Sequence, residues 1–108
     1  MKYYHITLMS NLDSVLKDGL IPQIGERSLA IGENEKAVYL FPSIYDAEEA
    51  LLNWLGDWYT DNYGIDVPLA LLEINLPTDF LIEDSIADYE KISRKAIPPK
   101  YISFLRKE

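Results

Sequence analysis

The chain has 108 residues, of which 48% are hydrophobic, and its 18 acidic and 10 basic residues give a formal charge of −8. This length and composition predict one domain over residues 1–108 with a single core, and the negative charge disfavours general binding to nucleic-acid backbones. The absence of cysteine excludes disulfides, thiolate nucleophiles and zinc–thiolate sites. No apolar run reaches the length that crosses a bilayer, so we expect a cytoplasmic protein without a membrane partner.

The N-terminal third is predicted to form a strand, a short helix and a loop. Residues 2–7 alternate between two faces and are rich in β-formers, which predicts a strand. Ser10 and Asp13 have the spacing of a capping box, and Gly19 stands where a left-handed C-terminal cap belongs, so a helix of about two and a half turns is expected between them. Residues 22–36 mix glycine, charge and apolar residues without a period, which predicts a loop.

A second strand and the longest helix are predicted next. Residues 37–41 are an apolar strand that Pro42 ends. A second capping box begins at Ser43, and the apolar residues that follow recur at helical spacing, which predicts one helix from about 44 to 61. Trp54 and Trp58 fall on the apolar stripe of this helix and are predicted to be core residues.

The second half of the chain is predicted to consist of strands. Residues 69–76 form a nearly continuous apolar run, as expected of a central strand that is covered on both faces. Further strands are expected at 80–83, 89–93 and 101–105. Two main helices early in the chain and strands late in the chain predict an α+β fold with a mostly antiparallel sheet.

Catalytic motifs that can be identified by spacing alone are missing from the sequence. It contains no Gly-rich phosphate loop, no G-x-S-x-G elbow and no H-E-x-x-H pair. Because His5 is the only histidine and the acidic clusters lack calcium-loop spacing, no metal site is predicted. By its residue type alone, His5 would be a structural histidine in the first strand.

Five segments together carry a family resemblance. They are YHIT at 4–7, NLDSVLKDGL at 11–20, VYLF at 38–41, LLEINL at 71–76 and IPPKYI at 97–102. In this order and spacing, the chain resembles the ADP-ribosyltransferase-like superfamily, including its small bacterial and phage members, its DNA-modifying toxins and the NAD-dependent RNA 2′-phosphotransferases. The fold that the resemblance implies is a compact single domain with a split, mostly antiparallel β-sheet.

The resemblance also implies a site. His5, Tyr39 and Glu90 would be the His-Tyr-Glu set of the family, with His5, Thr7, Tyr39 and Arg27 in contact with NAD. An imidazole can hold ribose hydroxyls, and a tyrosine ring offers a stacking face for nicotinamide. A carboxylate can stabilise the positive charge that develops on the ribose as the nicotinamide bond breaks. Arg27 is the candidate for the pyrophosphate, because a guanidinium suits phosphate geometry.

The acidic member of this set has competitors. Glu90 lies seven positions before the IPPKYI segment, where family members often carry their acid. On its own, a glutamate on an edge strand is commonly a device against aggregation. Glu83, Asp84 and Asp88 are alternatives for the acidic role.

The activity that the resemblance implies is an NAD-dependent mono-ADP-ribosyltransferase that modifies a macromolecule, a protein rather than a nucleic acid, and releases nicotinamide. One alternative is a non-catalytic acidic binding or inhibitor protein, of a phage anti-defence or antitoxin type, whose −8 charge faces a basic partner. An NAD-dependent 2′-phosphotransferase ranks last, because the extra basic residues and the additional domain of that family are missing.

Overall fold

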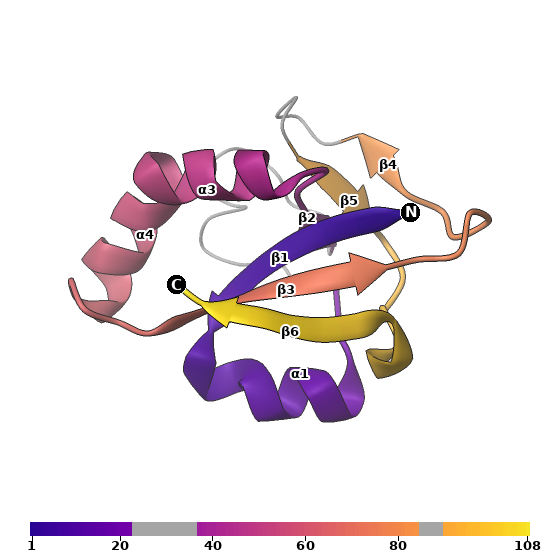
Figure 1. The fold of residues 1–108 in the computed structure, drawn as a ribbon, viewed down its shortest axis with the longest axis horizontal. Coiled ribbons are helices and arrows are strands. Elements are labelled where there is room, and N and C mark those ends of the chain that lie inside the picture. Colours follow the sequence, from indigo (N-terminus) through magenta and orange to yellow (C-terminus); the bar gives the residue numbers. More distant parts are fainter. Residues whose placement is uncertain (23–36, 85–89) are drawn as a thin grey trace.

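The structure is a computed structural model that describes residues 1–22, 37–84 and 90–108 (Figure 1). Within these residues the strands form two three-stranded sheets, and every pairing between them is antiparallel. The larger sheet has the order β1 (Lys2–Leu8), β3 (Leu69–Asn75), β6 (Ile102–Lys107), and the smaller has the order β2 (Val38–Leu40), β5 (Lys91–Ser93), β4 (Glu83–Asp84). The α-helices in this described part of the chain are α1 (Leu12–Asp18), α3 (Ile44–Leu52) and α4 (Trp54–Tyr63). The predicted α+β class and the antiparallel pairing are therefore confirmed.

Strand β3 is the centre of the larger sheet, as its apolar sequence predicts. It pairs with β1 on one side and with β6 on the other. Its register against β1 sets His5 opposite Leu72 and Thr7 opposite Ala70. Leu71 and Leu72 point to opposite faces and both are fully buried, so neither face of the strand is open to water.

Each face of the larger sheet has its own hydrophobic cluster. Val15 of α1 packs in the cluster that contains Leu72 and Ile74, whereas Ala47 of α3 packs in the cluster that contains Leu71. Helix α1 thus covers one face, and α3 and α4 cover the other (Figure 1). Because side chains alternate along a strand, residues 3, 5 and 7 of β1 share the face on which α1 lies.

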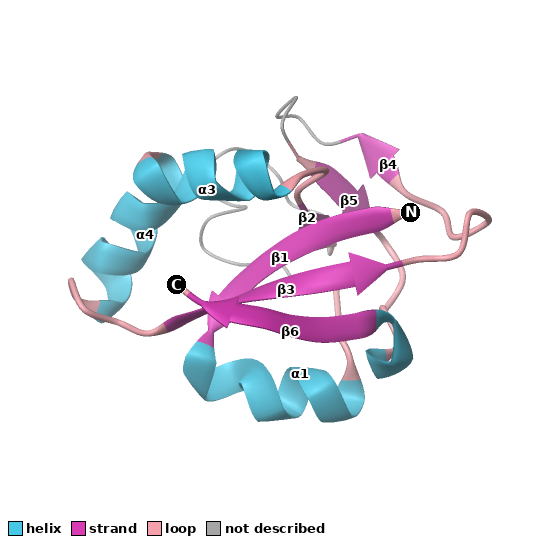
Figure 2. Cartoon of the chain, in the orientation of Figure 1, coloured by secondary structure: helices cyan, strands magenta, loops and turns pink. Residues whose placement is uncertain are grey.

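The two sheets meet at β1. Tyr4 and Phe41 exchange two backbone hydrogen bonds of 2.8 and 2.7 Å, which join β1 to the residue that follows β2. Figure 2 shows the smaller sheet behind the larger one, beyond the β1 edge. This junction sets the side chains of β1 next to those of β2.

The start of α1 differs from the prediction. The helix begins after a 3₁₀ turn, Met9–Asn11, and its N-cap Asn11 makes no side-chain cap hydrogen bond. Ser10 lies inside that turn, so the predicted capping box with Asp13 does not form. The helix ends at Gly19 as predicted, and Gly19 has a φ of +86° and donates its N–H to the carbonyl of Val15, but its ψ of −172° lies outside the left-handed helical region.

The long helix predicted over 44–61 is wrong as one element. It starts as expected, because Ser43 Oγ accepts a hydrogen bond from the Asp46 N–H, but it breaks at Asn53 into α3 and α4. The Asn53 side chain donates to the Glu49 carbonyl at 2.7 Å and so satisfies an acceptor that the break sets free. Gly56 lets the chain turn, because a Cβ there would lie 1.9 Å from the Leu51 carbonyl oxygen.

A Gly56→Ala variant tests this close approach. In an ordinary helix, replacing glycine by alanine stabilises the protein by up to about 1 kcal/mol. Here the added methyl meets backbone, so we expect a loss of about 1–3 kcal/mol in the free energy of unfolding, measured by urea denaturation. A stabilised variant would show that the break at Asn53 does not depend on Gly56.

The late strands are shifted from their predicted positions. Strand β4 begins at Glu83, three residues after the predicted start, because Phe80 and Ile82 pack on the core instead of pairing. Tyr89 lies outside the described residues, and β5 begins at Lys91. Strand β6 runs to Lys107, beyond the predicted end. Among the described helices, none has the length and apolar character needed to span a membrane.

Candidate functional site

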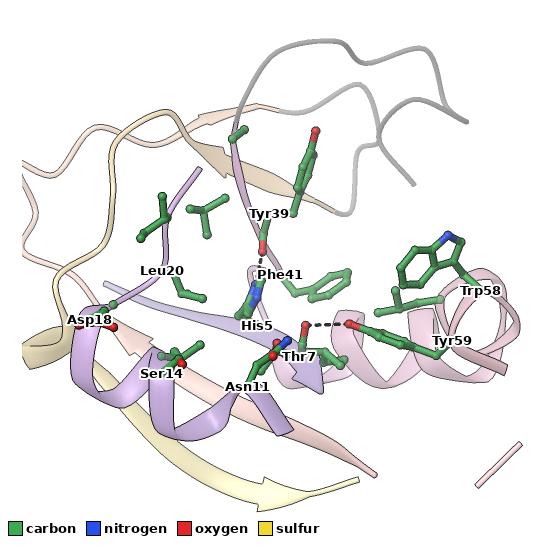
Figure 3. Close-up of a pocket in the computed structure, with 17 residues that line it drawn as sticks. His5, Thr7, Asn11, Ser14, Asp18, Leu20, Tyr39, Phe41, Trp58 and Tyr59 are labelled. Atoms are coloured by element: carbon green, nitrogen blue, oxygen red, sulfur yellow. Dashed lines mark hydrogen bonds between the residues drawn. The ribbon is translucent and has the colours of Figure 1, made fainter. Parts of the chain in front are cut away.

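A cavity of about 590 Å³ opens between β1, α1, β2 and α4 (Figure 3). Its volume lies within the range of small-molecule binding sites, about 300–1,000 Å³. The described residues that line it include five polar side chains, which are His5, Thr7, Asn11, Ser14 and Asp18. They also include four aromatic side chains, which are Tyr39, Phe41, Trp58 and Tyr59. Rings and hydrogen-bonding groups facing one cavity suit a ligand that combines a planar ring with hydroxyl groups.

His5 is fixed by a hydrogen bond between the two sheets. Its Nδ1 lies 2.7 Å from the backbone carbonyl oxygen of Tyr39. A carbonyl oxygen can only accept, so Nδ1 carries the proton in this contact. In the neutral ring, Nε2 is then the acceptor. The half-buried imidazole is thereby held in one tautomer and one orientation at the wall of the cavity.

The structure brings together three of the four residues predicted to contact NAD. His5 and Thr7 come from the same face of β1, and Tyr39 comes from β2, and all three line the cavity. Tyr39 is 9% exposed and packs with Ala37 and Ile92. Arg27, the fourth, lies outside the described residues.

Glu90 is not among the residues that line the cavity. It directly precedes β5 and is 1% exposed, which makes it one of the most deeply buried polar residues in the described chain. Because β5 pairs with β2, Glu90 is still close in the fold to the strand that carries Tyr39. Its role as the catalytic carboxylate stays a prediction.

The acidic competitors of Glu90 are engaged elsewhere or are not described. Glu83 accepts a hydrogen bond from Arg94 at 2.9 Å, and Asp84 pairs with Lys91, both on the smaller sheet and away from the cavity lining. Asp88 lies outside the described residues.

The polar residues that α1 and its preceding turn contribute to the cavity were not predicted as site residues. Asn11, Ser14 and Asp18 are spaced i, i+3 and i+7, so they share one side of α1 and its preceding turn, and all three line the cavity. This spacing was visible in the sequence. What could not be read was that this side of the helix faces His5.

Trp58 was predicted as core and instead lines the cavity. Trp54 does pack on the core, 6.5 Å from the ring of Phe41. In one continuous helix Trp58 would lie above it, one turn later, on the same stripe. The break at Asn53 gives α4 a different direction, and Trp58 and Tyr59 come to face the cavity.

The described lining of the cavity contains one acidic residue and no lysine or arginine. That acidic residue is Asp18 of α1. A ribose or an uncharged ring therefore fits the described wall, whereas a pyrophosphate would find no cation there. The described part of the chain also holds no group of three His, Asp or Glu side chains that could bind a metal ion.

No protein-family model, curated protein or solved structure matches this chain. The likeness to ADP-ribosyltransferases therefore rests on the residue pattern of the chain itself.

Proposed function

We propose that this chain is an NAD-dependent mono-ADP-ribosyltransferase and that the cavity between β1, α1, β2 and α4 binds NAD as its co-substrate. The observation that carries the proposal is the pairing of His5 with Tyr39. These residues belong to different sheets, line one cavity and are joined by a 2.7 Å hydrogen bond. They are also the first two members of the family's residue set.

The proposed reaction breaks the bond between nicotinamide and the anomeric carbon of ribose. The electron pair leaves with nicotinamide, so positive charge develops on the sugar, and the acceptor then forms the new bond to the anomeric carbon and loses a proton. The His5 imidazole would hold a ribose hydroxyl by a hydrogen bond, and the Tyr39 ring would stack on nicotinamide. The Glu90 carboxylate would stabilise the sugar cation and take up the acceptor's proton.

The acceptor that fits the charge of the chain is a protein. The −8 charge repels a polyanion and attracts a basic protein surface. The cytoplasm, where NAD is available as a co-substrate, is the proposed site of action.

A His5→Ala variant tests the site. We expect NAD to bind about tenfold more weakly, because one hydrogen bond of about 1–1.5 kcal/mol and the link to β2 are lost. Calorimetry gives the affinity, and chromatography gives the nicotinamide that is released. Lys17→Ala is the control, because Lys17 is exposed on α1 and does not line the cavity. Equal NAD affinity in both variants would remove His5 from the proposed site.

The burial of Glu90 favours one second candidate, a non-catalytic NAD-binding or partner-binding domain on the same scaffold. The Glu90 carboxylate is 1% exposed and is not among the described residues that line the cavity, as expected of a buried structural acid. The two functions differ in one measurement, since the transferase releases nicotinamide from NAD and the binding domain does not.

A further inference from the structure

Trp58 and Tyr59 of α4 line one end of the cavity, and the proposed reaction assigns no role to either side chain. In Figure 3, Tyr59 points from α4 toward the end of β1, and Trp58 lies on the same side of the cavity. Trp58 is only half-buried, although tryptophan is the largest side chain and its burial would add to the core.

This aromatic wall is held in place before any ligand arrives. The Trp58 ring is 5.0 Å from the Tyr59 ring and 6.0 Å from the Tyr63 ring, with edge-to-face geometry in both pairs. The Tyr59 hydroxyl donates to the backbone carbonyl of Ile6 at 3.3 Å, next to His5 in β1. An aromatic side chain fixed in this way loses little conformational freedom on binding, which is what a stacking platform needs.

The surroundings of this wall favour an uncharged ring. No described lining residue is a lysine or arginine, so the described wall does not attract a phosphate. The one carboxylate among the described lining residues, Asp18, comes from α1, across the cavity from α4 (Figure 3). A heteroaromatic base can gain stacking energy here without needing a charged partner.

We propose that Trp58, supported by Tyr59 and Tyr63, forms a second subsite that stacks a heteroaromatic base. The base has two possible sources with the same chemistry, the adenine of NAD or the base of a separate nucleoside. The inference rests on the proposed function only for this choice of source. The stacking itself requires neither NAD cleavage nor Glu90.

The chain contains two tryptophans, Trp54 and Trp58, so each can be made the only fluorescent indole. Trp54→Phe leaves Trp58 as the reporter, and Trp58→Phe leaves Trp54 as the matched control. Adenosine, NAD and nicotinamide mononucleotide are titrated into both folded variants, and the same samples are analysed for free nicotinamide. We expect saturable quenching by adenosine in the Trp54→Phe variant and none in the Trp58→Phe variant. In Trp58→Ala, adenosine binding should weaken roughly tenfold or more.

The source of the base follows from competition. If NAD quenches Trp58, nicotinamide mononucleotide does not, and NAD displaces adenosine, the subsite holds the adenine of NAD. If adenosine quenches further with the chain already saturated by NAD, the subsite holds the base of a separate nucleoside.

The subsite is overturned if adenosine quenches neither variant, with or without NAD, or quenches both equally. Quenching by nicotinamide mononucleotide alone also overturns it, since the wall would then stack nicotinamide. If a variant fails to fold, backbone amide shifts of α4 in the unsubstituted chain distinguish the same outcomes. Nicotinamide release reports separately on the proposed function, because a chain can stack adenosine and leave NAD intact.

Discussion

A Glu90→Gln variant should release nicotinamide from NAD about 10²–10³-fold more slowly than the original chain, while NAD affinity changes little. Glutamine has nearly the same shape as glutamate but no charge, so it cannot stabilise a sugar cation in the transition state. Loss of one preorganised electrostatic group typically costs this factor in rate. Chromatography of nicotinamide gives the rate, and calorimetry gives the affinity.

Three conservative variants serve as controls for Glu90. Glu83→Gln and Asp84→Asn remove carboxylates that are ion-paired on the smaller sheet, and Asp88→Asn removes the third competitor in the sequence. We expect each of them to keep nicotinamide release close to that of the original chain. If one of them loses the rate and Glu90→Gln keeps it, the catalytic role belongs to that other acid. If neither the original chain nor any variant releases nicotinamide from bound NAD, the chain is a binding domain.

A Gly19→Ala variant should lose roughly 2–4 kcal/mol of the free energy of unfolding. Two costs add at this position. A φ of +86° is strained for alanine, and the new Cβ would lie 2.2 Å from the Ile97 carbonyl oxygen. That carbonyl accepts from the Leu20 N–H at 3.0 Å, so any shift also weakens the bridge that ties the end of α1 to the segment before β6.

Gly64→Ala separates the two costs. Gly64 has a φ of +99° but nothing lies within 4 Å of its added Cβ, so only the backbone strain remains, about 1 kcal/mol. Urea denaturation of both variants gives the difference. Equal losses would mean that the contact with Ile97 relaxes freely. Because Gly19 also lines the cavity, we expect its variant alone to bind NAD more weakly.

The parts of the fold that were predictable are those in which one local pattern has one physical cause. The apolar run at 69–76 could be read as a central strand because burial on both faces leaves no polar alternation. Ser43 could be read as a helix cap because its hydroxyl competes for a nearby N–H.

The break between α3 and α4 was not predictable from periodicity. The apolar stripe continues through Asn53, and the break depends on a side-chain bond to Glu49 and on the missing Cβ of Gly56. Neither contact changes the hydrophobic pattern. Trp58 was misassigned for the same reason, since its direction depends on that break.

Three residues of the predicted site, His5, Thr7 and Tyr39, lie together on one cavity, and their function stays a prediction. The sequence pattern pointed to His5 and Tyr39, but the bond that joins them uses the Tyr39 backbone, which no side-chain pattern reveals. The burial of the Glu90 side chain could not be predicted either. Strand β5 has only three residues, which is too short for an alternation of polar and apolar residues that would assign a face.

The most direct test of the central claim is an NMR titration of the isotope-labelled chain with NAD, with free nicotinamide followed in the same sample. Saturable shifts of the His5, Thr7 and Tyr39 amides, accompanied by nicotinamide release, are the predicted result. The absence of shifts at millimolar NAD, or shifts confined to residues away from this cavity, would contradict the claim that the cavity between α1 and α4 is an NAD site.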